Sequence, residues 1–464
     1  MTPRAKSSPQ PEAATPADSG TARGRRLARG IVSSFASRGV AALVPLVMIP
    51  IMLPALGAPT YGSWMTIASI TAMLIWADLG LGSGLLTRLS RHLANNDHLS
   101  GRRDILATYS IVGLVACVLS ILTVVSPMFM SWPRLLNISE SFSESVTSIA
   151  IVCLLCFFFN MPLSLIQRVQ YASDQVNSSN LFTSTGPIIS LALTLGATRA
   201  QLPAALIVGS ATVGPLIANV GATIWFFGHN KFLIPRSSDR KGAEPLALLS
   251  LGGLYVLITM SSSLAINSDS LVIAHTLGPA EVAAFAVAAR VMAAMGLLIS
   301  LVNLPLWPAA ANALARGDTA WVRRTTHRMT LVSVVFVGCS SLVIMIISEP
   351  LIAALSKGLV GRDLALLACL GVWWTVVALT SPLMMVQNAA GVLVPQLVGW
   401  VVFLLASLPL KVLAVSSLGL YAGPLVGAVS YSVVVLPSAL WGYKRSMQLA
   451  ERKKIDQVTS TVDI

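Results

Sequence analysis

Long apolar runs separated by short polar segments dominate the sequence. No Asp, Glu, Lys or Arg lies between Arg38 and Asp78 or between Asp363 and Lys411. Because about 20 apolar residues suffice to cross a bilayer as a helix, each of these two uncharged gaps holds most of two membrane spans. The runs are apolar on every face, whereas the strands of a membrane barrel would alternate in polarity. The pattern therefore predicts an all-α protein whose helices satisfy their own backbone groups in lipid.

Twelve such spans are expected, separated by short loops. Prolines within them, among them Pro187 and Pro215, are expected to kink the helices because proline has no N–H to donate. The spans are expected near residues 30–55, 62–87, 104–130, 146–167, 180–198, 204–228, 246–274, 281–308, 326–348, 363–386, 396–415 and 420–442.

Composition and charge agree with a multi-pass membrane protein. Of the 464 residues 55% are hydrophobic and 11% charged, against roughly 25% charged in soluble domains. The net charge of +13 does not require a nucleic-acid partner, because cytoplasmic loops of membrane proteins are rich in Lys and Arg. With the N-terminus inside, 24 basic residues fall on the inner side and 4 on the outer side. This split predicts that both termini are cytoplasmic.

An internal repeat divides the spans into two halves. When the chain is aligned on itself at a constant offset, Leu56-Gly57 falls on Leu277-Gly278, and the loop pattern LAxxDxxxxRR that contains Asp97 recurs with Asp318. Both copies follow a second span on the same side, which predicts two parallel six-helix lobes around a central cavity. The expected organisation is a disordered basic tail (1–29), an N-terminal lobe (30–228), a cytoplasmic linker (229–245), a C-terminal lobe (246–442) and a cytoplasmic tail (443–464).

Three segments carry a family resemblance. The run LPALGAPTYGSW, followed by ADLGLGSGLLTRL, resembles the opening of bacterial polysaccharide-export and O-antigen-type flippases. The segment NSDSLVIAHTLGPAEVAAFAVAARV is similar to the seventh and eighth spans of that family. The family belongs to the multidrug/oligosaccharidyl-lipid/polysaccharide exporter superfamily. The second half lacks the Tyr-Gly pair of the first, so Tyr61 is expected to be an interfacial aromatic residue rather than a transport residue.

The resemblance implies a function. It implies that the protein moves an undecaprenyl-diphosphate-linked oligosaccharide from the inner to the outer leaflet of the bacterial inner membrane, for surface polysaccharide biosynthesis. The implied partners are the lipid-linked glycan and membrane lipids, with polysaccharide polymerases or glycosyltransferases as further candidates. No cofactor is implied.

Charged residues inside the spans are the candidate site. Arg38 and Arg290, one in each half, could hold the lipid diphosphate, because guanidinium groups match phosphate oxygens. Alternatively, each arginine pairs with Asp78 or Asp269 and only holds helices together. Asp78 and Asp269 could instead bind a coupling ion. Lys411 lies near the outer end of its span and is expected to extend to the interface, with a cavity role as the alternative.

Three other functions compete with flipping. A multidrug or small-metabolite exporter of the same superfamily would favour an acidic cavity, but two arginines and two aspartates are not net acidic. An integral-membrane glycosyltransferase or polymerase would need carboxylates, and the outer loop 131–145 offers Glu140 and Glu144, a pair also typical of a solvated loop. A scaffold without transport activity is the third. No metal-protease, dinucleotide or ATP motif occurs in a loop, so neither an enzyme nor a metal site is expected.

Overall fold

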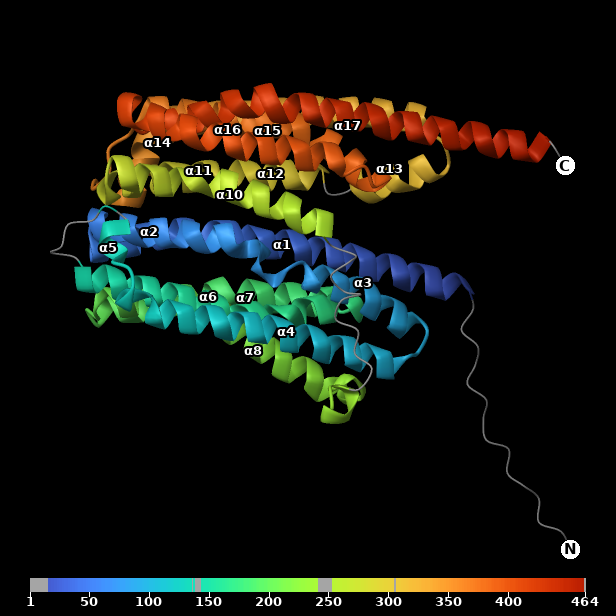
Figure 1. Ribbon diagram of the computed structural model, residues 1–464, viewed down its shortest axis with the longest axis horizontal. Helices are drawn as coiled ribbons and strands as arrows, with labels where there is room; N and C mark the ends of the chain where they lie inside the picture. Colours follow the sequence, from blue (N-terminus) through green and yellow to red (C-terminus); the bar gives the residue numbers. More distant parts are fainter. Residues whose placement is uncertain (1–15, 136, 138–142, 241–252, 304–305, 463–464) are drawn as a thin grey trace, which may run out of the picture.

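The computed structural model describes residues 16–135, 137, 143–240, 253–303 and 306–462, and these form helices and loops without a strand (Figure 1). Eleven of these helices are long and apolar enough to cross a membrane, or up to twelve if a bent pair counts as one span. The all-α multi-pass fold expected from the sequence, with two six-helix lobes, is confirmed.

One large hydrophobic core contains buried residues of α1, α2, α4 and α6 of the N-terminal lobe and continues into residues 272–292 of the C-terminal lobe. The short helix α5 lies at the end opposite the start of α1 (Figure 1). The elements of the N-terminal lobe are α1 (Pro16–Leu56), α2 (Ala58–Met73), η1 (Leu74–Asp78), α3 (Leu81–Ala94), α4 (His98–Val125), η2 (Ser126–Met128), α5 (Trp132–Leu135), α6 (Ser143–Ala172), α7 (Val176–Arg199) and α8 (Ala204–His229).

A short linker leads to the C-terminal lobe and contains η4 (Lys231–Leu233) and η5 (Ser237–Arg240). It is held against α4 by Arg102, whose Nε lies 3.1 Å from Asp239 Oδ2. Residues 241–252 of the expected linker and seventh span lie outside the described part. The C-terminal lobe consists of α10 (Gly253–Thr276), α11 (Pro279–Met292), α12 (Ala294–Asn303), α13 (Leu306–Ala315), α14 (Thr319–Ser356), α15 (Leu364–Ala390), α16 (Val394–Leu418) and α17 (Ala422–Val462).

The repeat seen in the sequence is also a repeat of helix boundaries. The starts of α2 and α11, the ends of α3 and α13, and the starts of α4 and α14 are each separated by the offset that aligns Leu56 with Leu277. Asp97 and Asp318 accept hydrogen bonds of 3.0 Å from backbone N–H groups in the first turns of α4 and α14, so both are N-caps. Gly57 and Gly278 precede α2 and α11 with φ of +72° and +96°, a conformation that favours glycine. The repeated residues therefore define the same turns in both lobes.

The two lobes lie as two layers, with the start of α1 and the end of α17 at the same end of the molecule (Figure 1). At the opposite end they are in close contact. A Cβ on Gly62 of α2 would collide with the carbonyl oxygen of Pro279 and lie 3.1 Å from the backbone nitrogen of Ala283, both on α11. Asn137 Nδ2 donates to the carbonyl of His275 across the same end, at 2.9 Å. The molecule is thus closed at the end away from the termini.

Both predicted tails are partly helical in the structure. The first helix begins at Pro16, so the expectation of disorder is wrong for residues 16–29, while residues 1–15 lie outside the described part. Alanine, arginine and leucine in this segment are good helix formers, and extending an existing helix needs no new nucleus. At the other end α17 continues without a break to Val462, well past the end of the expected twelfth span.

The second and eighth spans are interrupted rather than straight. The pair formed by α2–η1 and α3 is bent by 41°, and the residues at the break, Leu79 and Gly80, have φ of +54° and +69°. This break falls in the glycine-rich stretch where the sequence allows a bend or close packing. In the eighth span α11 ends at Met292 and α12 follows from Ala294.

Candidate functional site

A pocket of about 170 Å³ lies between the lobes. Four helices of the N-terminal lobe contribute to it, namely α1, α2, α7 and α8, and α11 is the contribution of the C-terminal lobe. Arg290 is the one charged residue in its lining. The lining residues are Val44, Pro45, Met48, Tyr61, Trp64, Pro187, Ser190, Ala211, Pro215 and Arg290.

Arg290 brings an uncompensated positive charge to this pocket. Its Nη2 lies 3.5 Å from the sulfur of Met65, a weak acceptor, and within the described ranges no carboxylate forms an ion pair with it. Arg290 follows the start of α11 by eleven residues, which is about 17 Å along a helix, near the middle of a bilayer core about 30 Å thick. A guanidinium at this depth with no anionic partner favours an anionic ligand.

Arg38 does not line the pocket. It lies on α1 six residues before Val44, about 9 Å closer to the end that carries the termini. Its side chain is partly buried and makes no hydrogen bond or ion pair with any residue that the structure describes. The structure therefore separates the two candidate arginines, and only Arg290 lines the pocket.

Asp269 pairs with Lys411 and not with an arginine. Lys411 Nζ lies 2.7 Å from Asp269 Oδ1, and it donates to the carbonyl of Ala265 at 3.0 Å and to Ser268 Oγ at 3.2 Å. Lys411 is 2% exposed, so the expectation that it extends to the interface is wrong. The physical reason is that α10 supplies three oxygen acceptors to an ammonium group that would otherwise have to reach water.

Asp78 stabilises the bend of the second span. Its Oδ1 accepts the N–H of Gly80 at 3.0 Å, and its Oδ2 lies 3.2 Å from the point where a Cβ on Gly82 would sit. Arg168 Nε of α6 is 3.5 Å from that same point, and no ion pair between Asp78 and an arginine is found in the described part of the chain. The alternative in which each candidate arginine neutralises Asp78 or Asp269 is thus not found, and ion coupling by these aspartates stays a prediction.

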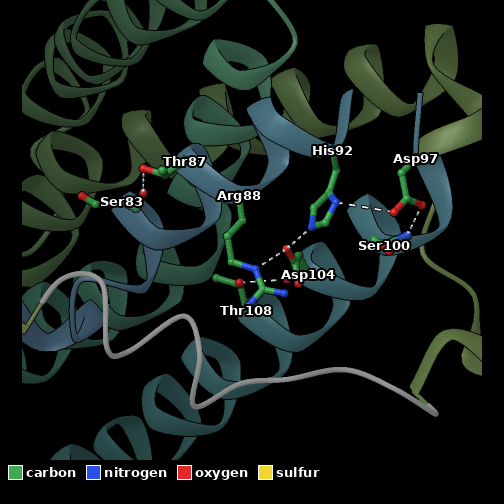
Figure 2. Close-up of polar contacts among 8 residues, drawn as sticks. All are labelled: Ser83, Thr87, Arg88, His92, Asp97, Ser100, Asp104 and Thr108. Carbon is green, nitrogen blue, oxygen red and sulfur yellow. Dashed lines mark hydrogen bonds and ion pairs between the residues drawn. The ribbon is translucent and has the colours of Figure 1, made fainter. Parts of the chain in front are cut away.

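A second polar cluster ties α3 to α4 (Figure 2). Asp104 is 3% exposed, and its Oδ2 lies 2.9 Å from Arg88 Nε and 3.3 Å from His92 Nε2. The other ring nitrogen of His92 is 3.6 Å from Asp97 Oδ2. Hydrogen bonds from Ser100 lower the pKa of Asp97 below its ordinary value. The charges of this cluster compensate one another, so the cluster stabilises the contact between α3 and α4 and offers no unpaired charge to a ligand.

Sequence reasoning missed two features of the pocket, its aromatic wall and a buried hydroxyl. Tyr61 is 1% exposed and packs edge-on against Trp64 with ring centroids 5.5 Å apart, so the expectation of an interfacial aromatic is wrong. It faces the other lobe, not water, because α2 lies at the contact between the lobes. Ser190 had no signal in the sequence beyond its neighbour Pro187. Glu140 of the enzyme alternative and the side chain of Glu144 lie outside the described part.

The sequence matches the model of one protein family. The family is described as "Polysaccharide biosynthesis protein", and the match covers residues 27–313, which is more than half of the chain. It spans the N-terminal lobe, the linker and the first helices of the C-terminal lobe, and therefore every element that contributes to the pocket. No curated protein matches the chain significantly.

Solved structures of transporters have a similar fold. An inward-facing multidrug resistance MATE family transporter of the MOP superfamily is 16% identical, with 89% of this chain and 99% of that chain covered and a TM-score of 0.61. A MATE transporter from Vibrio cholerae is 15% identical, with 93% and 98% covered and a TM-score of 0.65. A MOP superfamily transporter from Pyrococcus furiosus is 13% identical, with 91% and 95% covered and a TM-score of 0.60. At these identities the likeness concerns the fold.

Proposed function

Because this chain belongs to the polysaccharide biosynthesis protein family and has a transporter fold, we propose that it is a flippase for lipid-linked oligosaccharide. Its substrate is an undecaprenyl-diphosphate-linked oligosaccharide, which it moves from the inner to the outer leaflet of the bacterial inner membrane. It acts as a transporter and not as an enzyme. Polysaccharide polymerases or glycosyltransferases that make or consume this substrate are the candidate partners.

The unpaired guanidinium of Arg290 is the observation that supports this substrate most directly. A lipid diphosphate carries concentrated negative charge at a fixed position, and arginine offers planar, bidentate donors to it. The Arg290 guanidinium lies in a pocket between the lobes, the region where transporters built of two repeats bind their substrates, which supports this assignment. Arg38, about 9 Å closer to the termini, would meet the diphosphate first.

A multidrug or metabolite exporter is the second candidate, and the MATE-like fold favours it. The sign of the pocket charge separates the two functions. A cationic drug needs a carboxylate, whereas the pocket lining contains an arginine and no Asp or Glu. For the MOP superfamily transporter from Pyrococcus furiosus, the reverse polarity of the binding pocket suggests a different function, which is the same criterion applied to another protein of this fold.

Reconstituted transport distinguishes these candidates. Purified protein in liposomes should expose a fluorescent undecaprenyl-diphosphate-linked oligosaccharide to an impermeant quencher, while Arg290→Ala protein of equal abundance should not. The same vesicles should not release a cationic dye along an imposed proton or sodium gradient. Dye efflux without movement of the glycan lipid would replace the flippase by the multidrug exporter.

Topology belongs to the same proposal, since the substrate is made on the cytoplasmic side. Both termini and the linker are proposed to be cytoplasmic, with the closed end of the molecule facing the outer side. Ser238 is exposed in the linker, so Ser238→Cys is a suitable reporter. In intact cells it should react with permeant reagents only, and strong reaction with an impermeant thiol reagent added outside would contradict the orientation.

A further inference from the structure

Three oxygen atoms from one turn of α10 surround the ammonium group of Lys411. Lys411 Nζ lies 2.7 Å from Asp269 Oδ1, 3.0 Å from the carbonyl oxygen of Ala265 and 3.2 Å from Ser268 Oγ. The Ser268 hydroxyl donates its own proton to the Ala265 carbonyl at 2.9 Å, so toward Lys411 it acts as an acceptor. A carboxylate, a carbonyl and a hydroxyl oxygen around one position are the ligand types of a cation site.

This position is enclosed by three further helices of the C-terminal lobe, namely α15, α16 and α17. Gly423 and Gly427 lie one turn apart on α17, where a Cβ would lie 3.5 Å from Asp269 Oδ1 and 3.8 Å from Lys411 Cε, respectively. The ring of Trp373 on α15 lies 3.4 Å from the same point beside Gly427. The ammonium group is therefore held by protein oxygens almost without access of water.

Stability alone is a weak reason for such an arrangement. Burying a lysine and an aspartate removes both charges from water, and well-packed apolar residues of similar volume are often as stable or more stable in their place. Arg88 and Arg102, for comparison, are 20% and 18% exposed in their ion pairs and so keep contact with water. Ionised residues within membrane spans generally mark sites that handle ions or substrates.

We propose that Ala265, Ser268 and Asp269 form a cation site in the C-terminal lobe, and that Lys411 occupies this site as a permanently tethered cation. Its ammonium group takes the place that a free ammonium ion would hold, with three N–H donors for three oxygens. This lobe therefore takes up no cation from solution, and Asp269 is not available to a coupling ion. The inference concerns the use of ions by the transporter and holds for any substrate.

Removing the tether should make the site exchangeable. Lys411→Ala leaves the three oxygens in place, and the purified variant should be less stable than wild-type protein in choline chloride. Replacing choline by ammonium at constant ionic strength should raise its unfolding temperature saturably, by roughly 2–4 °C, because a ligand that binds only the folded state stabilises it. Wild-type protein should show no such shift with ammonium, potassium or sodium. Lys411→Ala combined with Asp269→Asn should not respond either, because the carboxylate is missing.

Arg88→Ala is the matched control, because it too removes a cationic partner of a buried carboxylate, yet His92 remains 3.3 Å from Asp104. Ammonium should leave its unfolding temperature unchanged. No response in Lys411→Ala, or an equal response in the double variant or in Arg88→Ala, would overturn the cation site.

Two further outcomes would also contradict the proposal. A saturable response of wild-type protein that Asp269→Asn abolishes would mean that the site is already open and that Lys411 is not its occupant. Failure of Lys411→Ala to fold in ammonium as well as in choline, while the double variant folds, would mean that a free cation cannot replace Nζ. These measurements need no lipid-linked substrate, so their failure would leave the proposed function standing.

Discussion

The two lobes have the same arrangement of helices, but residues at equivalent positions have different roles. At the offset that aligns Leu56 with Leu277, Met48 and Ser190 of the N-terminal lobe correspond to Asp269 and Lys411 of the C-terminal lobe. In the first lobe these positions border an open pocket. In the second, the carboxylate and the ammonium group are 2.7 Å apart and occupy the space between α10 and α16.

The difference shows how a repeated fold acquires one site instead of two. The C-terminal lobe fills its counterpart of the pocket with an ion pair, and next to it Trp373, Trp400, Phe403 and Tyr431 form an aromatic cluster. The N-terminal lobe has small residues, prolines and an unpaired hydroxyl at the equivalent depth. The N-terminal lobe thus supplies most of the pocket lining, and the C-terminal lobe contributes Arg290 to it.

Breaking the buried ion pair should have the largest effect on stability. Lys411→Met leaves the Asp269 carboxylate without its ammonium partner, and removing one member of a buried pair costs about 3–5 kcal/mol. Combining it with Asp269→Asn should recover most of that loss, because no unpaired charge remains. Folded yield and thermal unfolding in detergent measure both. If the double variant also lost substrate binding at normal stability, the C-terminal lobe would have a role in the site.

Forcing the lobes apart at their closed end should have the next largest effect. A side chain in Gly62→Val must displace the backbone of α11, and overpacking of this kind typically costs about 1–3 kcal/mol, enough to shift a two-state equilibrium roughly five- to hundredfold. In a protein without the five native cysteines, a thiol reagent added at the closed end should label Ala211→Cys faster when Gly62→Val is also present. Gly113→Val is the control, since nothing lies within 4 Å of a Cβ there. Unchanged labelling would mean that this contact does not close the molecule.

The ionic cluster of Figure 2 should matter less. Asp104→Asn weakens the contacts to Arg88 and His92, for which a loss of about 1–2 kcal/mol is expected because both partners also reach solvent. At the repeat offset the second lobe has Ala309, Ala313 and Thr325, so it forms its α13–α14 turn without the cluster. In Asp104→Asn, the free energy of unfolding measured with denaturant should therefore decrease modestly, and ligand binding to the pocket should not change. A transport defect at full stability would instead give the cluster a direct function.

The linker contact should have the smallest effect. A backbone hydrogen bond from Arg236 and the Arg102 guanidinium lower the pKa of Asp239 below its ordinary value of 3.8. A carboxylate with a lowered folded-state pKa stabilises the fold above its unfolded pKa and loses that contribution as the pH falls through the folded value. The docked linker should thus resist proteolysis at neutral pH and loosen only well below pH 4. Asp239→Asn should be cleaved faster at neutral pH, and equal cleavage rates would exclude a docking role.

Local signals in the sequence predicted much of the fold. The spans follow from uncharged gaps, and the repeat follows from residues whose local roles are fixed, namely the N-caps Asp97 and Asp318 and the turn glycines Gly57 and Gly278. The helical part of the N-terminal tail was harder to predict, because this polar segment forms a helix as an extension of the membrane span that follows it in α1.

Partners far apart in the chain were not predictable in the same way. Nothing in the sequence says that Lys411 turns toward α10 and not toward water, or that Tyr61 faces the other lobe. The pocket itself depends on two prolines and a serine whose roles emerge only when α7 and α8 pack together. Arg290 was identified because a charge within an apolar span is rare, whereas a serine is not.

The most direct test of this account is transport per folded molecule for substitutions at Arg290. Bidentate recognition of the diphosphate predicts that Arg290→Lys is impaired and Arg290→Ala more so, since a charge-assisted hydrogen bond contributes about 1.5–3 kcal/mol, or roughly ten- to hundredfold in affinity. Arg38→Ala, outside the pocket, should be affected less, and all three proteins should fold in normal amounts because neither arginine has a carboxylate partner in the described part of the chain. Full transport of the lipid-linked oligosaccharide by Arg290→Ala would contradict the central claim.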